Sequence, residues 1–180
     1  VEGAKILLKI LGISACAIGI EVNKPDAIST MQSAVEKLQE PGLTLRVETL
    51  EVKYPTGSEK QLIQAITGRK VPAMALPSTV GVVVHNVSTT KAVYDAVVLG
   101  KPLIEKVITV SGRGIKKPAN LLVKIGTKVK DIVEFCGGTT EDLSRVVLGG
   151  PMMGFTVPGP DVPVVKTTNC ILAPTEEELP

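Results

Sequence analysis

The sequence predicts an α/β region followed by a smaller α+β region. Over residues 1–99, apolar runs without polar alternation take turns with amphipathic segments, a pattern typical of βαβ crossovers in a parallel sheet. After Gly100-Lys101-Pro102 the apolar runs are short and surround one helical segment. The chain has 180 residues, of which 44% are hydrophobic and 21% charged. This composition favours a buried core and is not typical of disordered proteins.

The first half of the α/β region is expected to form a helix, a strand and a second helix. Residues 3–11 place their apolar side chains at helical spacing. Residues 15–20 are a continuous apolar run, typical of a strand that is covered on both faces. Pro25 and Asp26 favour a helix start, and this helix is expected to run to about Leu38.

The second half of this region continues the alternation. A strand is expected over 45–52 and a helix over 59–66. The Pro-rich segment 71–77 is expected to cross the surface as a loop. The apolar run 80–84 is predicted to be a third parallel strand, followed by a helix that runs to about Leu99.

The second region is expected to contain three strands around one short helix. The strands are predicted over 107–110, 121–125 and 145–148, with a Gly-containing turn over 111–114 between the first two. A helix is predicted over 128–135, closed by Gly137 and Gly138.

Composition and spacing exclude several classes of protein. Only 2% of the residues are aromatic and the formal net charge is +2, which argues against base stacking and phosphate attraction in a nucleic-acid-binding protein. No apolar run reaches the roughly 18 residues of a membrane-spanning helix. Cys16, Cys136 and Cys170 form no CxxC pair, so no metal site is expected. The chain begins with Val1 and shows no leader, so no secretory signal is expected.

Three junctions follow the predicted parallel strands, at residues 21–23, 54–59 and 85–89. Ligands of open parallel sheets bind beyond the carboxyl ends of the strands, so these junctions are expected to converge on one ligand. The second combines the Tyr54 ring, Gly57 and the Glu59 carboxylate. The third places amide and hydroxyl groups before a helix, which suits a phosphate. The alternative interpretation is that the residues of these junctions only stabilise the fold.

In that structural alternative, Ser58 and Thr89 cap helices and Glu59 complements a helix dipole. His85, which is the single histidine of the sequence, could act in acid–base chemistry. No second titratable group or nucleophile lies in its motif, so a role in lining the site is the favoured interpretation.

Several motifs in order along the chain resemble the C subunits of Rnf electron-transport complexes. The resemblance covers almost the whole chain, including Tyr54-Pro-Thr-Gly-Ser-Glu-Lys-Gln-Leu-Ile63 and Val82-Val-Val-His-Asn-Val-Ser-Thr89. It continues through Val107–Asn120, Glu134–Gly138, Gly149–Gly154 and Val164–Leu172.

This resemblance implies a membrane-associated, ion-translocating electron-transport complex. Its C subunit is expected to oxidise NADH through FMN and to pass electrons to [4Fe–4S] clusters, with ferredoxin and the other Rnf subunits as partners. It is expected to lie peripherally on the cytoplasmic face of the bacterial inner membrane. Residues 1–102 would be the C-terminal part of a Rossmann-like FMN/NADH domain. Residues 103–154 would be a β-grasp domain, and 155–180 a linker toward an iron–sulfur domain outside this chain.

The resemblance also nominates site residues. Tyr54, Gly57 and Glu59 would lie beside the flavin, with Glu59 as the candidate catalytic residue. Asn86, Thr89 and His85 would hold the phosphate end of the flavin. The family's Gly-rich loop is expected before this chain and its Cys-rich motifs after it, so a middle fragment with a partial site, inactive by itself, is expected. The alternative function is a non-enzymatic ligand-binding or subunit-docking module.

Overall fold

A computed structural model describes residues 1–159 and 161–179. The chain divides into two compact units, Val1–Lys101 and Pro102–Pro180. Mixed helix and strand content in both agrees with the predicted α/β and α+β classes at that level. In the part of the chain that is described, no helix is both long and apolar enough to cross a membrane.

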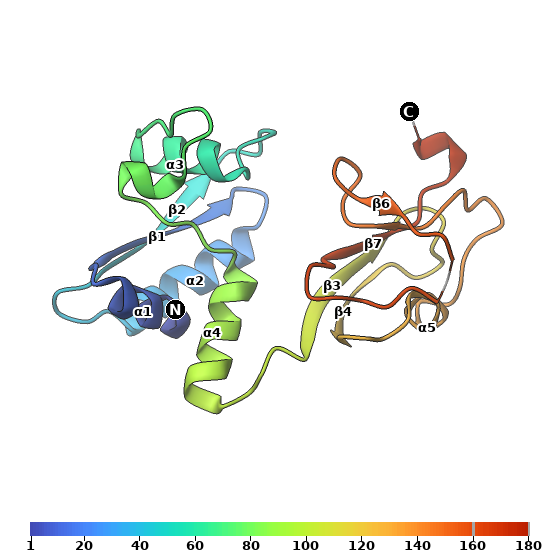
Figure 1. The fold of residues 1–180 in the computed structure, drawn as a ribbon, viewed down its shortest axis with the longest axis horizontal. Coiled ribbons are helices and arrows are strands. Elements are labelled where there is room, and N and C mark those ends of the chain that lie inside the picture. Colours follow the sequence, from blue (N-terminus) through green and yellow to red (C-terminus); the bar gives the residue numbers. More distant parts are fainter. Residues whose placement is uncertain (160, 180) are drawn as a thin grey trace. The chain divides into compact units, whose positions relative to one another are not determined.

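The first unit follows the predicted alternation of helices and strands for most of its length (Figure 1). Its elements are α1 (Glu2–Leu11), β1 (Ala15–Glu21), α2 (Pro25–Lys37), β2 (Thr44–Leu50), α3 (Glu59–Thr67), the 3₁₀ helix η1 (Pro77–Val80) and α4 (Val87–Leu99).

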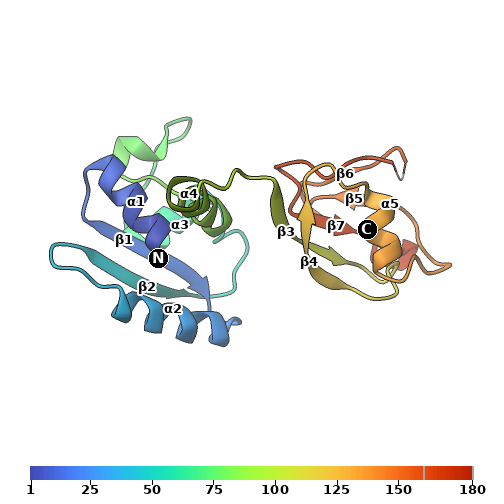
Figure 2. The same ribbon diagram turned by 90° about the horizontal axis from the view of Figure 1, so that it is seen from below.

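The strands β1 and β2 form a two-stranded parallel sheet, with Ala15 opposite Thr44 and Glu21 opposite Leu50. Helix α2 makes the crossover between them and lies alongside the pair (Figure 2). A small core joins Leu8 of α1, Val35 of α2 and Leu45 of β2. The sheet therefore packs against the helix that precedes β1 and against the crossover helix.

Two glycines allow helices to approach closely in this unit. A Cβ at Gly19 of β1 would lie 2.9 Å from Leu50 and 3.3 Å from both Leu62 and Ile66, so α3 packs directly on β1 at this position. A Cβ at Gly3 of α1 would lie 2.0 Å from the Thr90 carbonyl oxygen, so α1 crosses α4 in contact with its backbone. Any larger residue at either position would separate the two elements.

The predicted third strand over 80–84 is wrong. Residues 77–80 form η1, and Gly81 then adopts a left-handed conformation with φ +69°. The Gly81 and Val82 amides donate to Ser78 and Pro77, so a turn uses the groups that would begin a ladder. Residues 82–86 run on without strand pairing. The sequence pattern fails here because an apolar run alone does not specify a strand.

The second unit contains a five-stranded mixed sheet and a short helix. Its elements are β3 (Glu105–Ser111), β4 (Ala119–Lys124), α5 (Val129–Phe135), β5 (Val147–Leu148), β6 (Phe155–Thr156), β7 (Cys170–Leu172) and the 3₁₀ helix η2 (Glu176–Glu178). The strand order is β4-β3-β7-β5-β6, and β3 with β7 is the parallel pair among otherwise antiparallel neighbours. The predicted strands and helix of this region are confirmed, with shifted ends.

The expectation that residues 155–180 form a linker is wrong for the residues that the structure describes there. Strand β7 lies between β3 and β5, and Val164, Ile171 and Ala173 are each 0% exposed. The Ala173 amide donates to the Ser111 carbonyl at 2.8 Å. Val164 enters the core apart from the others, whereas Ile171 and Ala173 alternate with the half-buried Leu172 at strand spacing. Strand β7 has only three residues, so its alternation is too short to be recognised in the sequence.

Asp161 holds this same segment against the start of α5. Its Oδ1 lies 2.9 Å from both Lys128 Nζ and Lys130 Nζ. Hydrogen bonds from these two lysines, and then their charges, lower the pKa of the Asp161 carboxyl from its ordinary 3.8 to about 2. The backbone amide of Val129 donates to Val162 at 2.9 Å beside this ion pair.

Replacing Ile171 tests whether the last segment belongs to the core. We expect Ile171→Ala to lower the free energy of unfolding of the second unit by about 2–5 kcal/mol, because it opens a cavity in a closed core. Val165→Ala is the matched control, since Val165 is 45% exposed and exposed sites change stability by less than about 0.5 kcal/mol. Urea unfolding measures both variants. Equal losses in the two would contradict the assignment of β7 to the core.

The ion pairs of Asp161 predict a pH dependence. Because its folded-state pKa is lowered to about 2, the carboxylate's contacts stabilise the fold above pH 3.8 and are lost as the pH falls toward 2. In the double variant Lys128→Gln, Lys130→Gln, the Asp161 pKa should rise toward 3.8, as followed by carboxyl chemical shifts. Lys124→Gln, on the exposed end of β4, should leave it unchanged. An unchanged pKa in the double variant would refute this role of the lysines.

Candidate functional site

The six predicted site residues lie at the starts of two helices. Tyr54 and Gly57 lie in the loop between β2 and α3, and Glu59 is the first residue of α3. His85 and Asn86 directly precede α4, and Thr89 lies in its first turn.

The loop before α3 is turned by its own backbone and faces solvent. The Thr56 amide donates to Lys53 at 2.7 Å and the Ser58 amide to Pro55 at 2.8 Å. Tyr54 is 78% exposed, and Glu59 is exposed as well. Ser58 occupies the N-cap position, but its hydroxyl contacts the Gln61 side chain and caps no backbone amide, so the expectation of a Ser58 cap is wrong. The loop thus presents a ring and a carboxylate at a helix start.

Asn86 caps α4. Its Oδ1 accepts a hydrogen bond from the Ser88 amide at 2.9 Å, and its carbonyl oxygen accepts from the Thr90 hydroxyl at 3.2 Å. Thr89 is exposed and does not cap the helix, so the expectation of a Thr89 cap is wrong. The reason is one of register: the helix begins at Val87, which puts the capping position at Asn86.

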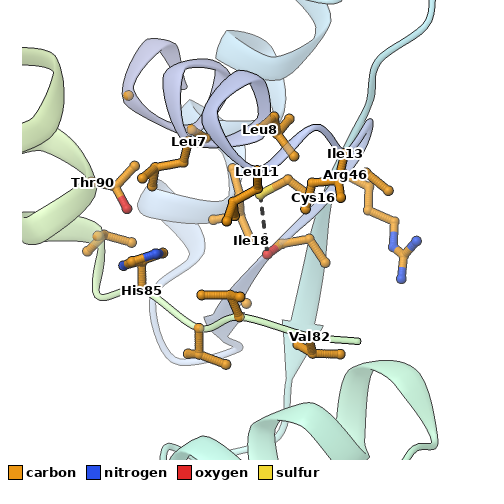
Figure 3. A pocket seen from close by; sticks show the side chains of 18 of the residues that line it. Leu7, Leu8, Leu11, Ile13, Cys16, Ile18, Arg46, Val82, His85 and Thr90 are labelled. Carbon is orange, nitrogen blue, oxygen red and sulfur yellow. Dashed lines mark hydrogen bonds between the residues drawn. The ribbon is translucent and has the colours of Figure 1, made fainter. Parts of the chain in front are cut away.

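A large apolar cavity occupies the first unit. Its volume is about 1300 Å³, and its walls come from α1, β1, α3, the extended segment 81–85 and the start of α4. Figure 3 shows Leu7 and Leu11 of α1 on one side of it, with Val82 and His85 on the segment that closes another side. The apolar lining includes Leu7, Leu8, Leu11, Ile13, Cys16, Ile18, Met31, Leu62, Ile66, Val82 and Val84.

Cys16 behaves as part of this apolar wall. Burial raises the pKa of its thiol, so the sulfur stays protonated at neutral pH. Its Sγ contacts the neighbouring Ala17 carbonyl oxygen at 3.9 Å, drawn as the dashed line in Figure 3. A neutral, half-buried thiol contributes packing in the manner of a small hydrophobic residue.

The charged groups around the cavity are mostly basic. Arg46, Arg69 and Lys91 contribute to the lining, and Glu2 is its acidic member. Arg46 pairs with Glu48 at 2.5 Å and Lys91 with Asp95 at 2.5 Å, which offsets those two charges. Arg69 donates to the Val80 carbonyl oxygen at 2.8 Å. An apolar space with this charge balance favours a ligand that has an apolar body and an anionic group.

The structure brings one of the six predicted residues to this cavity. His85 lies in the lining, whereas Tyr54, Gly57, Glu59, Asn86 and Thr89 do not. Sequence reasoning missed Arg69, Thr90, Lys91 and Tyr94, which also line it. The sequence feature that could have drawn attention to Arg69 is its position directly after Gly68, the left-handed residue that ends α3. Whether the six residues bind a cofactor stays a prediction.

The second unit offers a smaller hollow of about 370 Å³. Its lining consists of Ser111, Gly112, Arg113, Ile115, Pro118, Leu172 and Glu178. The Glu178 carboxylate accepts from the backbone amides of Thr175 and Arg113, each at 3.1 Å, and these bonds lower its pKa. In the residues described, no group of three or more His, Cys, Asp or Glu side chains is placed to hold a metal ion.

Comparison with known proteins gives two family matches. Residues 1–95 match the family described as the Nuo51 FMN-binding domain, and residues 107–156 match the SLBB domain. These spans account for most of both units.

Similar curated proteins are the C subunits of ion-translocating oxidoreductase complexes. The C subunit of such a complex from Rhodobacter capsulatus is 49% identical over 99% of this chain and 34% of its own length. The C subunit of the proton-translocating ferredoxin:NAD(+) oxidoreductase complex from Clostridium ljungdahlii is 46% identical over 99% of this chain and 38% of its own length. The chain thus spans about a third of these relatives. They confirm the resemblance to Rnf C subunits.

Replacing Asn86 tests its capping role. We expect Asn86→Ala to lower the free energy of unfolding of the first unit by about 1 kcal/mol, because the Ser88 amide loses its acceptor. Asn86→Ser should retain most of the stability, since serine also caps helices. Thermal unfolding monitored by circular dichroism measures both. If Ala and Ser destabilise equally, the side chain is not acting as a cap.

Proposed function

Because this chain belongs to the Nuo51 FMN-binding domain family, we propose that its first unit forms part of a flavin site in the C subunit of an ion-translocating oxidoreductase complex. The match over residues 1–95 carries this proposal. In the complete subunit, NADH would be oxidised through FMN, and electrons would pass to [4Fe–4S] clusters and, through the complex, to or from ferredoxin. The name of the relative from Clostridium ljungdahlii includes ferredoxin and NAD(+), and this supports the part of the proposal that concerns these two partners.

The first unit fits FMN by size and by charge. A cavity of about 1300 Å³ exceeds the roughly 300–1000 Å³ that drug-sized ligands occupy. FMN has a flat ring system with an apolar dimethylbenzene end and an anionic phosphate, and the apolar walls and the Arg69 guanidinium support this assignment. When bound, FMN exchanges electrons between a nicotinamide and iron–sulfur centres. The chain's own residues would bind and orient it.

Within this proposal the two helix starts have separate roles. At the start of α4, the Thr89 hydroxyl and the first-turn amides other than that of Ser88, which is bonded to Asn86, suit a phosphate. Tyr54, Gly57 and Glu59 do not line the cavity, so the proposal that they lie beside the flavin, with the Glu59 carboxylate near its reacting end, rests on the motif resemblance. Asn86 would contribute by fixing the first turn of α4.

The finer architectural proposals follow the same resemblance. We propose that residues 1–102 belong to a Rossmann-like FMN/NADH domain and that residues 103–154 belong to a β-grasp domain, whose sheet also includes β6 and β7. The three cysteines lie in separate elements, Cys16 in β1, Cys170 in β7 and Cys136 after α5. This separation supports placing the [4Fe–4S] ligands elsewhere in the complete subunit. The subunit would lie peripherally on the cytoplasmic face of the bacterial inner membrane, beside the other Rnf subunits.

A second candidate function is docking of a ligand or a partner protein by the second unit. The SLBB match over residues 107–156 favours it, and the hollow of about 370 Å³ beside Arg113 is large enough for a small ligand. Under this alternative the loop before α3 would have no part in electron transfer.

Replacing Glu59 separates the two functions. In the complete subunit that carries this chain, we expect Glu59→Gln to slow reduction of the bound flavin by NADH by roughly tenfold or more, because a charge beside the reacting centre is lost. Stopped-flow absorbance of the flavin measures the rate.

The matched control is Glu51→Gln, at an exposed glutamate on the other side of the same loop. This variant should be reduced at the wild-type rate. An unchanged rate in Glu59→Gln would contradict the flavin role of this loop and favour the docking module.

A further inference from the structure

The extended segment 82–86, whose residues 82–85 form one wall of the cavity, does not belong to a sheet. The Val82 amide donates to Pro77 at 3.3 Å, and the Asn86 carbonyl oxygen accepts from the Thr90 amide at 3.0 Å. Between these two ends, residues 83–85 make no backbone hydrogen bond to any other residue that the structure describes. No ladder fixes the position of this wall, which leaves the packing of the half-buried Val82 and Val84 and the hydrogen bonds at its two ends.

The far end of the wall is fixed by α4. Asn86 caps this helix, and its first-turn amides and hydroxyls hold the Asn86 backbone. At the near end, η1 finishes at Val80 and Gly81 turns the chain with φ +69°. A turn of four residues is a weak support by itself. A further contact is needed to hold the start of the wall.

Arg69 supplies that contact. Its Nη1 donates to the Val80 carbonyl oxygen at 2.8 Å. A Cβ built at Gly81 would lie 3.4 Å from the same nitrogen, so the guanidinium is in contact with the backbone of the turn. Arg69 also lines the cavity together with the wall that it holds.

The other end of Arg69 is anchored in the core of the first unit. Its backbone amide donates to Thr67 Oγ1 at 3.1 Å, and that hydroxyl donates to the Ile63 carbonyl oxygen at 2.7 Å. Ile63 is 2% exposed. A continuous set of hydrogen bonds therefore runs from the last turn of α3 through Arg69 to the first residues of the wall.

We propose that Arg69 is a positioning residue, which fixes the wall 82–86 and thereby places His85 and Asn86 relative to α3. A second clamp, from Lys60 Nζ to the Pro72 carbonyl oxygen at 2.8 Å, holds the beginning of the 68–81 connection to the first turn of α3. Lys60 follows Glu59 directly, so the connection is fastened beside both candidate helix starts. Loss of Arg69 would release the end of the 68–81 connection near Val80 and leave the end held by Lys60 in place.

Backbone dynamics of this 180-residue chain test the proposal without any ligand. In the wild type, NMR order parameters of residues 82–86 should be near the rigid value of about 0.85. In Arg69→Met they should fall below about 0.6, the range of flexible backbone, while the amides of α3 stay rigid. Arg69→Lys should restore part of the order, since lysine donates a hydrogen bond but lacks the planar guanidinium.

The matched control is Lys70→Met, at the adjacent exposed cation. Within residues 1–159 and 161–179 this lysine makes no hydrogen bond or ion pair. The control should leave the order parameters unchanged. If Arg69→Met prevents folding of the first unit, Arg69→Gln replaces it, because glutamine is too short to bridge to Val80. Wild-type order over 82–86 in a folded Arg69 variant that lacks the guanidinium would overturn the proposal.

A second arm rests on the proposed flavin function. In the complete subunit, Arg69→Met should raise the Kd of FMN roughly tenfold, because ordering the loosened wall on binding would cost about the free energy of the lost hydrogen bond to Val80. Absence of flavin binding in the wild-type subunit would refute the flavin site while leaving the order parameters to decide the role of Arg69. Wild-type affinity in Arg69→Met, with the wall disordered, would refute the functional part of the inference.

Discussion

The parallel pairing of β1 with β2 is the constraint on which the first unit depends. Two adjacent parallel strands require a crossover, and α2 provides it. Both strands then end at the same edge, and the chain leaves β2 there to form the loop before α3. Helix α3 returns across β1, where Gly19 leaves room for Leu62 and Ile66. The packing of α3 on β1 at Gly19 therefore determines where Arg69 lies, and through Arg69 the position of the cavity wall.

Much of the fold could be predicted because local signals agreed with the tertiary structure. Pro25 and Asp26 mark the start of α2, and the apolar run at 15–20 forms the strand β1. The expected coverage of both its faces is not borne out, because every residue of β1 is half-buried or exposed. The run at 80–84 carried the same apolar signal but follows a Pro77 turn and contains Gly81, which leaves it without a ladder. Ile171 shows the opposite failure. It lies in a strand of three residues, which is too short for its alternation with Leu172 to be detected in the sequence.

The parts of the candidate site that lie within one short stretch of sequence could be predicted. The parts that packing brings together from separate elements could not. Glu59 and Asn86 stand beside helix starts, and capping chemistry and loop glycines mark such positions in the sequence. The cavity instead joins Leu7, Cys16 and His85, which come from three elements far apart in the chain. Only packing brings them together, so spacing rules carry no information about them. The motif resemblance supplied the family, which the residue chemistry alone left open.

The central position of β7 has a consequence for the order in which the second unit can be made. β7 pairs with β3 and β5, but it is synthesised more than twenty residues after β5 and about sixty after β3. Until Leu172 has left the ribosome, both neighbours expose unpaired backbone edges. Folding of this unit is therefore a late event in vectorial synthesis, whereas β1 and β2 of the first unit are complete by Leu50. During elongation, the nascent second unit is the part of the chain in need of protection from aggregation.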